Sequence, residues 1–107
     1  MAETFSNVKL TAKANVYFDG RITSRTFFTE DGSRKTLGIV LPGSYEISIG
    51  AEEYVELLTG ALEVTTTTDN GKWKTVMPGE SFTVPANSTF TMRTYVVSDY
   101  ICSYAKN

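Results

Sequence analysis

The side chains best suited to chemistry in this chain are one carboxylate and one arginine, because the sequence has no histidine and a single cysteine. Glu53 begins an apolar stretch. A carboxylate facing an apolar interior would have a raised pKa, which suits a general acid or a hydrogen-bond donor, whereas at the rim of a cavity it would simply be solvated. Arg34 follows an Asp-Gly turn, and its guanidinium could clamp phosphate or carboxylate through paired hydrogen bonds. Arg21, Arg25 and Arg93 lie on other predicted strands, and each arginine could equally be a surface charge.

The sequence lacks two common kinds of site, the histidine-dependent nucleophile and the glycine-rich phosphate loop. Without histidine there is no Ser-His-Asp or Cys-His constellation. No glycine-rich phosphate loop precedes a predicted helix. Cys102 is therefore interpreted as a small buried apolar residue and not as a nucleophile.

Aromatic residues are abundant and could serve in two ways. A small β domain uses them by default as core, but a subset at the mouth of a cavity would also stack on a planar ligand such as a nucleobase. The sequence does not separate these roles for the candidates, which are Tyr17, Phe18, Tyr45, Phe82, Phe90, Tyr100 and Tyr104.

The elements that must position these side chains are predicted to be short strands separated by Gly and Pro turns, a spacing typical of all-β sandwiches and barrels. The predicted strands are Val8–Ala12, Gly20–Thr29, Lys35–Leu41, Ser44–Ile49, Glu53–Thr59, Ala61–Thr67, Lys72–Met77, Ser81–Val84, Phe90–Tyr95 and Ser98–Tyr104. Asp31-Gly32 and Asn70-Gly71 indicate type I′ hairpin turns, whose two central residues both have positive φ. Alternation places Tyr100, Cys102 and Tyr104 on one face of the last strand.

Length and charge limit the classes of partner. The chain has 107 residues, so a single domain (1–107) with an N-terminal strand or arm (1–14) is expected. A net charge of −2 and a pI near 5.0 give no electrostatic reason to expect nucleic acid or an anionic membrane as a partner. No apolar run approaches the roughly 18 residues of a membrane span, residues 1–14 lack the apolar region of a signal peptide, and the lone cysteine favours a reducing cytoplasm.

Two spacings resemble the conserved motifs of cupins. Gly79 and Pro85 are separated by five residues, and Glu53 is followed by six residues and Gly60. In metal-binding cupins three histidines accompany these residues, whereas here their positions fall on Ile47, Ile49 and Phe90. The resemblance implies an all-β, cupin-like β-barrel of the jelly-roll type. Since transition-metal sites need three or four suitable donors, no metal is expected.

A closer resemblance covers Asn15–Tyr104. The chain is similar to the small cupin-fold pyrimidine/purine nucleoside phosphorylases, and the similarity rests on many short motifs in conserved order. These are Asn15-x-Tyr17-Phe18-x-Gly20, Ser24, Phe27, Arg34-x3-Gly38, Gly43-x-Tyr45, Ser48, Glu53, Gly60-Ala61-Leu62-x-Val64, Trp73, Gly79-x2-Phe82-x-Val84-Pro85-x2-Ser88-x-Phe90 and Tyr100-x-Cys102-x-Tyr104. The resemblance implies an enzyme that converts a nucleoside and inorganic phosphate into a free base and a pentose 1-phosphate, with phosphate as co-substrate and no other cofactor. A homodimer is the expectation by analogy with the fold.

The residues fit this chemistry, because phosphorolysis requires only that the protein place phosphate, hold the ribose and stabilise the leaving base. We expect Arg34 to clamp phosphate and Glu53 to hydrogen-bond the ribose hydroxyls or protonate the base. Candidate substrate-binding residues are Tyr45, Ser48, Phe90 and Tyr104; alternation places Ser48 opposite Tyr45, so both point inward only if a bulge intervenes.

Two other interpretations stay open at this point. One is a non-catalytic cupin that binds a sugar or nucleotide-like small molecule, for which ligand affinity without loss of nucleoside is expected. The other is a structural β module whose interior is filled by its own aromatic side chains. No ligand would then raise its melting temperature.

Overall fold

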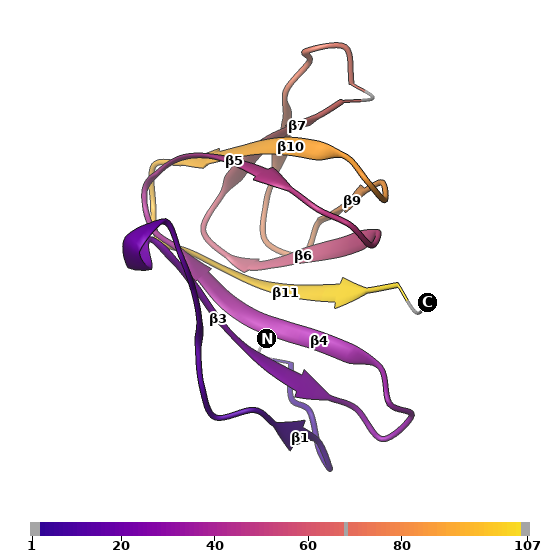
Figure 1. Cartoon of the computed structure of the whole chain (residues 1–107). Coiled ribbons are helices and arrows are strands. Elements are labelled where there is room, and N and C mark those ends of the chain that lie inside the picture. The colour runs from indigo at the N-terminus through magenta and orange to yellow at the C-terminus, as the bar shows by residue number, and fades with distance from the viewer. Residues whose placement is uncertain (1–2, 68, 106–107) are drawn as a thin grey trace.

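The computed structural model describes residues 3–67 and 69–105, and within them all regular structure is strand apart from one short turn of 3-10 type (Figure 1). In chain order the elements are β1 (Lys9–Leu10), β2 (Asn15–Tyr17), η1 (Phe18–Gly20), β3 (Ile22–Phe28), β4 (Arg34–Val40), β5 (Gly43–Ser48), β6 (Glu53–Thr59), β7 (Leu62–Thr66), β8 (Lys74–Val76), β9 (Ser81–Val84), β10 (Thr89–Thr94) and β11 (Ser98–Tyr104). The all-β prediction is confirmed. None of the helices in the described part of the chain is long and apolar enough to cross a membrane.

The strands form two sheets that lie as two layers (Figure 1). The larger sheet has the order β1-β3-β4-β11-β6-β9, with β2 also pairing with β3. The smaller sheet has the order β5-β10-β7-β8. Because the pairings among the described residues stay within each sheet, the predicted barrel is an open, two-layered version of the cupin arrangement and not one continuous hydrogen-bonded cylinder.

Each of the ten predicted strands is present, and three have the predicted bounds: Glu53–Thr59, Ser81–Val84 and Ser98–Tyr104. The prediction missed β2 and the turn that follows it. Asn70 and Gly71 both have positive φ (51° and 77°), as predicted for their turn. The type I′ prediction for Asp31-Gly32 is wrong, because Gly32 alone of the pair has positive φ and the loop closes through hydrogen bonds between Thr29 and Ser33.

The main core lies between the two sheets. Its buried members are Ile22, Val40, Tyr45, Val55, Leu57, Leu62, Val64, Val76, Phe82, Val84, Phe90, Met92 and Cys102. Phe27 and Ile101 are also buried but lie outside this cluster. Phe5 packs on Phe27 with ring centroids 4.9 Å apart, and β1 pairs with residues 27–28 of β3. The N-terminal arm is thus held against its own chain.

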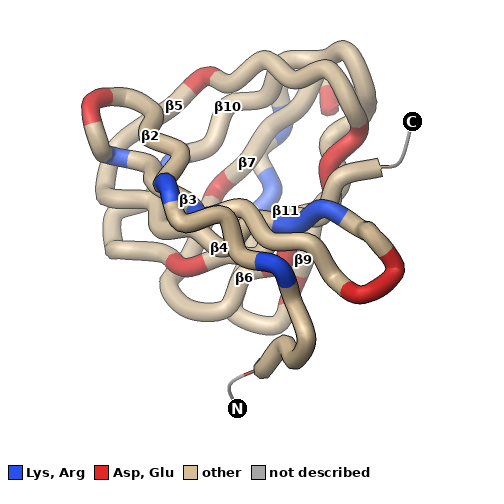
Figure 2. Tube along the Cα trace, turned by 60° about the horizontal axis from the view of Figure 1, so that its bottom comes forward, with Lys and Arg blue, Asp and Glu red and all other residues tan. Residues whose placement is uncertain are grey.

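Charges of both signs are distributed around the trace (Figure 2). This mixed distribution agrees with the small net charge of −2.

Candidate functional site

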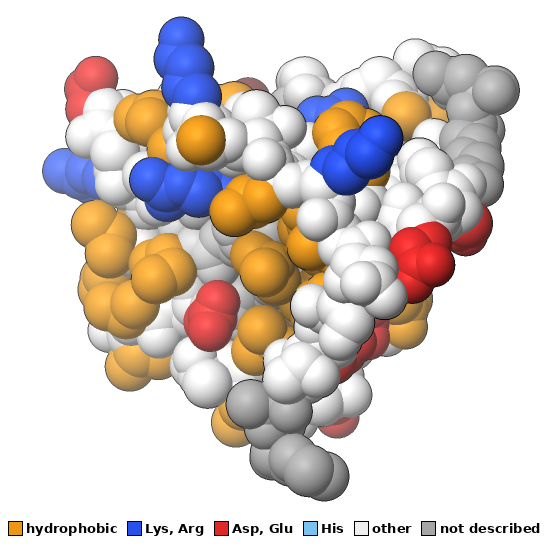
Figure 3. Space-filling view, turned by 90° about the horizontal axis from the view of Figure 1, so that it is seen from below, with side chains coloured by type: hydrophobic (Ala, Val, Ile, Leu, Met, Phe, Trp, Pro, Cys, Tyr) orange, Lys and Arg blue, Asp and Glu red, His pale blue; other side chains and the backbone are white. Residues whose placement is uncertain are grey.

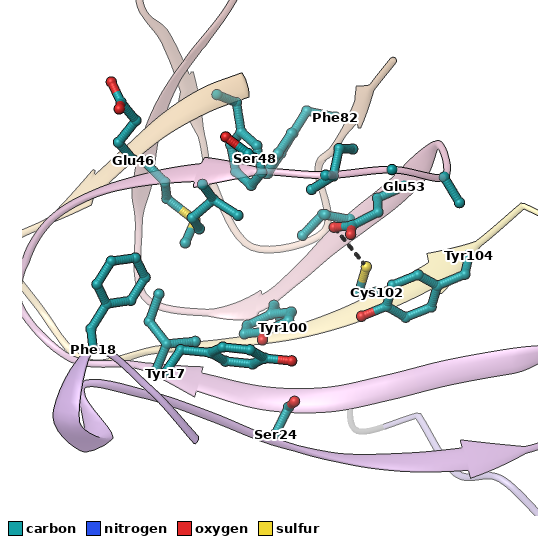
Figure 4. Close-up of a pocket in the computed structure, with 18 of the residues that line it drawn as sticks. Tyr17, Phe18, Ser24, Glu46, Ser48, Glu53, Phe82, Tyr100, Cys102 and Tyr104 are labelled. Atoms are coloured by element: carbon teal, nitrogen blue, oxygen red, sulfur yellow. Dashed lines mark hydrogen bonds between the residues drawn. The ribbon is translucent and has the colours of Figure 1, made fainter. Parts of the chain in front are cut away.

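A cavity of about 630 Å³ opens between the two sheets (Figure 4). Its lining consists of Tyr17, Phe18, Ile22, Ser24, Arg34, Glu46, Ile47, Ser48, Ile49, Gly50, Ala51, Glu53, Val55, Phe82, Phe90, Met92, Tyr100, Cys102 and Tyr104. The alternative interpretation, in which aromatic side chains of the chain itself fill the interior, is therefore wrong. The volume falls in the range of typical small-molecule sites.

Glu53 faces this cavity from the first position of β6, in register with Tyr104 of β11. The Cys102 thiol donates a hydrogen bond to Glu53 Oε1 over 3.4 Å (Figure 4). Burial raises the pKa of Glu53 above its ordinary value, while the Cys102 hydrogen bond and the charge of Arg34 oppose that rise. Burial also raises the pKa of Cys102 to about 12, so the thiol stays protonated and acts as a donor.

Arg34 is the one cationic residue in the described lining, and it lies at the first position of β4. Its Cζ lies 4.2 Å from the ring centroid of Tyr104, a cation–π contact that holds the guanidinium over the polar end of the cavity. The Tyr104 hydroxyl lies 3.3 Å from Thr36 Oγ1, and burial raises the Tyr104 pKa, so the residue stays a neutral phenol. The arginine therefore remains available to an anion.

Tyr100, Ser24 and Asn15 provide a second polar group on the larger sheet. Ser24, Gly38 and Tyr100 are register partners on the adjacent strands β3, β4 and β11. A Cβ at Gly38 would lie 2.5 Å from the Tyr100 hydroxyl oxygen, so the phenol crosses the strand where a side chain is missing and reaches Ser24. Asn15 Nδ2 donates to Ser24 Oγ and Thr26 Oγ1 over 3.2 and 2.9 Å.

Tyr17 and Phe18 approach the cavity from the end of β2. The chain leaves the extended conformation there, since Phe18, Asp19 and Gly20 have φ values of 53°, 55° and 91°. Left-handed backbone costs a residue with a Cβ about 1–2 kcal/mol, so the turn is strained at Phe18 and Asp19. The strained segment is held by the Phe18 ring on Tyr45, with centroids 5.0 Å apart, and by the Arg21 N–H to Phe18 carbonyl hydrogen bond of 3.2 Å.

The smaller sheet contributes apolar side chains and two polar ones, Glu46 and Ser48. Ile47, Ile49 and Phe90, which the sequence analysis assigned by spacing to the cupin histidine positions, all line the cavity, and Phe90 packs on Phe82 with centroids 6.1 Å apart. Within residues 3–67 and 69–105 no group of three or more His, Cys, Asp or Glu side chains could hold a metal ion. The three positions that the cupin spacing predicts for histidines thus carry apolar side chains that line the cavity.

Five of the six predicted site residues line this one cavity, namely Glu53, Arg34, Ser48, Phe90 and Tyr104. Tyr45 does not, because its ring folds back over Gly43 into the core and its hydroxyl donates to the Leu41 carbonyl over 2.7 Å. Ser48 borders the cavity from the exposed side of β5, where its hydroxyl lies 2.9 Å from Thr89 Oγ1.

Tyr17, Phe18, Ser24 and Tyr100 are lining residues to which the sequence analysis gave no specific role in the site. The pattern Tyr100-x-Cys102-x-Tyr104 pointed to one of them, because alternation places all three side chains on the face that Glu53 also uses.

Fold and cavity together define a class, a cupin-like domain whose cavity has most of its polar lining on the larger sheet. A Cupin_2 domain of an XRE-family transcriptional regulator from Enterobacter cloacae shares the fold, with a TM-score of 0.67 and 17% identity over 81% of this chain and 98% of that chain. A crystal structure of a protein of unknown function from Acinetobacter sp. ADP1 is more similar, with a TM-score of 0.91 and 35% identity over 95% of this chain and 98% of that chain.

Sequence comparison gives the particular family. The sequence profile of pyrimidine/purine nucleoside phosphorylase matches residues 12–104. A pyrimidine/purine nucleoside phosphorylase from Chlorobium chlorochromatii (strain CaD3) is 49% identical over 100 residues, which cover 94% of this chain and 95% of that protein. The chain therefore belongs to the pyrimidine/purine nucleoside phosphorylase family. The predicted resemblance is confirmed, and with it the prediction of an enzyme.

Proposed function

We propose that this protein catalyses the phosphorolysis of purine and pyrimidine nucleosides. A phosphate oxygen forms a bond to the anomeric carbon of the pentose as the glycosidic C–N bond breaks. The electron pair of that bond stays on the base nitrogen, which takes up the proton that hydrogen phosphate loses as it becomes an ester, and the products are a free base and a pentose 1-phosphate. The observation that carries the proposal is that Arg34 and Glu53, from different strands, meet in one cavity of a chain from this family.

Arg34 binds phosphate in this proposal. Phosphate is an anion, and Arg34 is the one cationic residue in the described lining. Its planar guanidinium suits the paired hydrogen bonds that phosphate accepts, and the Tyr104 ring 4.2 Å below limits its motion. Thr36 and Tyr104 hold each other through their hydroxyls and keep that ring in place.

Glu53 holds the pentose. Its carboxylate lies one strand from Tyr104, so a sugar next to the bound phosphate lies against it. Ionised, Glu53 accepts hydrogen bonds from ribose hydroxyls and stabilises the positive charge that develops on the sugar ring in an oxocarbenium-like transition state. Cys102 orients the carboxylate by donating to Oε1. Ile47, Ile49 and Phe90 cover the reacting centre on the other side and limit water there.

The remaining proposals concern cofactors, assembly and location. We propose that the reaction needs phosphate but no metal or organic cofactor, because the cupin histidine positions hold Ile47, Ile49 and Phe90. A homodimer would cover the outer face of β4, where the hydrophobic Leu37 and Ile39 are 39% and 43% exposed. Figure 3 shows hydrophobic side chains on the surface of the molecule seen from below. The cytoplasmic location stays a prediction.

The experiment that tests the function is a panel assay. Purified protein is incubated with uridine, cytidine, adenosine, inosine and guanosine, with and without phosphate, and free bases are separated chromatographically. Base release that requires phosphate supports phosphorolysis. Release without phosphate would indicate a hydrolase, and nucleoside binding without any release would indicate a non-catalytic cupin; either result contradicts the proposal.

A further inference from the structure

We infer that the nucleobase binds at the end of the cavity formed by Tyr17, Phe18 and Tyr100. The rings of Tyr17 and Phe18 pack against the base there, and the Ser24 hydroxyl lies at its polar edge. The inference rests on the proposed phosphorolysis and specifies the base subsite of that cavity. It assigns roles to residues that the sequence analysis left undivided between core and ligand contact.

The turn after β2 is what places two adjacent rings on one cavity. Neighbouring side chains of a strand point to opposite faces, so an extended chain would direct one of Tyr17 and Phe18 away from the cavity. The left-handed backbone at Phe18 changes that direction, and both side chains line the cavity. Figure 4 shows them at the same end, apart from Glu53, Cys102 and Tyr104. A strained conformation at a non-glycine residue is a feature that clusters at binding sites.

Exposure distinguishes these rings from the other aromatic candidates. Tyr17 and Phe18 are 51% and 43% exposed, so their surfaces are open to a ligand. Phe90 is 4% exposed and packs on Phe82, and Tyr104 has one ring face covered by the Arg34 guanidinium. Phe90 therefore has little surface left for a base, and Tyr104 offers at most one ring face. Phe18 also packs on Tyr45, but much more of Phe18 than of Phe90 stays exposed.

The polar groups at this end suit bases of both classes. Ser24 and Tyr100 hydrogen-bond to each other in the structure, and because hydroxyl groups both donate and accept hydrogen bonds, the pair can offer a donor or an acceptor to a base at this end. Asn15 fixes Ser24 by donating to its Oγ over 3.2 Å, and Gly38 leaves the space in which the Tyr100 ring lies. Hydroxyl groups that serve as donor or acceptor suit the N–H and carbonyl groups of purines and pyrimidines alike.

Charge sets the direction in which the nucleoside lies. Arg34 is at the Tyr104 end, so phosphate binds there, and the neutral base takes the uncharged aromatic end. The ribose then lies next to the phosphate, within reach of Glu53 at the same end, and the base extends toward the other end. This order places the anomeric carbon between the attacking phosphate and the leaving base, as an in-line displacement requires.

The test compares Tyr17→Leu with Tyr95→Leu. Both changes remove a tyrosine ring, but Tyr95 is 80% exposed and does not line the cavity. Initial rates of base release from adenosine and uridine are measured against nucleoside and, separately, against phosphate. We expect Tyr17→Leu to raise the nucleoside KM about tenfold or more, with a larger effect on adenosine than on uridine, and to leave the phosphate KM unchanged. Tyr95→Leu should match the parent, and Tyr17→Phe should restore the nucleoside KM.

Phe18→Leu provides a second, independent variant, because it keeps an apolar side chain on Tyr45 while removing the ring. Thermal melting of every variant checks folding. A parent that releases no base with phosphate would contradict the proposed function itself. An active parent whose nucleoside KM is the same in Tyr17→Leu, Phe18→Leu and Tyr95→Leu would overturn the inference and leave the function standing.

Discussion

The two sheets that enclose the cavity differ in what they present to it. The larger sheet contributes hydroxyl, thiol, carboxylate and guanidinium groups from β3, β4, β6 and β11. The smaller sheet contributes Ile47, Phe90 and Met92 together with Glu46 and Ser48, and Ile49 follows directly after β5. The cupin spacing predicts the histidine positions at three of these apolar residues, Ile47, Ile49 and Phe90. The thiol, the guanidinium and the partly buried carboxylate of Glu53 thus lie on one sheet, whereas the other contributes an apolar wall with Glu46 and Ser48 on the exposed side of β5.

This division predicts that substitutions on the larger sheet act on catalysis, whereas comparable substitutions on the smaller sheet act on packing. The largest effect is expected at Glu53. Glu53→Gln keeps the shape of the side chain but removes the charge that faces the ribose, and we expect kcat/KM to fall about 100-fold or more. The measurement is steady-state base release from uridine, with circular dichroism to check folding.

Glu56→Gln is the matched control, because Glu56 lies on the opposite face of β6, in register with Ile101. Equal activity of the two variants would remove Glu53 from the mechanism.

Arginine substitutions compare the sheets directly. Arg34→Ala removes the cation of the cavity, and we expect the phosphate KM to rise about 10- to 100-fold, since a hydrogen bond to a charged group contributes about 1.5–3 kcal/mol. Arg93→Ala, on β10 of the smaller sheet, breaks a 2.8 Å ion pair with Glu63 and a contact with Trp73 but touches no part of the cavity. Its phosphate KM should stay at the parental value. A similar rise in both variants would show that phosphate binding does not depend on the larger sheet.

Strand alternation explains why much of the polar sheet was predictable. The bounds of β6, β9 and β11 were predicted, and the shared face of Tyr100, Cys102 and Tyr104 followed from the two-residue period. The joint placement of Glu53 with Tyr104 then depends only on strand pairing. In a regular strand the sequence alone predicts to which face of the sheet each side chain points.

The part that alternation does not cover was not predictable. β2 has three residues, and the φ values of 53° and 55° at Phe18 and Asp19 contradict what a phenylalanine in a β-rich segment favours. Tyr45 shows a different limit. Alternation placed it inward correctly, but how far its ring folds back over Gly43 depends on tertiary packing that no local pattern records.

The larger sheet also depends on close packing at Gly38, which we expect to affect the stability of the protein. Gly38→Ala would place a Cβ 2.5 Å from the Tyr100 hydroxyl oxygen and 2.7 Å from the Thr23 carbonyl oxygen, and overpacking of this kind costs about 1–3 kcal/mol. Gly50→Ala meets no atom within 4 Å and should be nearly neutral. Chemical denaturation of both variants measures the difference. Equal stabilities would mean that the Tyr100 ring does not lie in the space that a side chain at Gly38 would fill.

The smallest expected effect is a pH dependence of stability that comes from Glu53. Burial raises its pKa in the folded protein by more than Cys102 and Arg34 lower it, so the folded state prefers the protonated acid. The stabilising contribution is fully present below the unfolded value near 4.5 and is lost as pH rises through the raised folded value. Glu53→Gln cannot titrate, so its melting temperature relative to the parent should increase between pH 4 and pH 7, and Glu56→Gln should show no such increase. If the relative melting temperature fell over this range, attraction to Arg34 would outweigh the effect of burial on the Glu53 pKa. The carboxylate would then form a charged pair with Arg34 and would not be a partly buried acid.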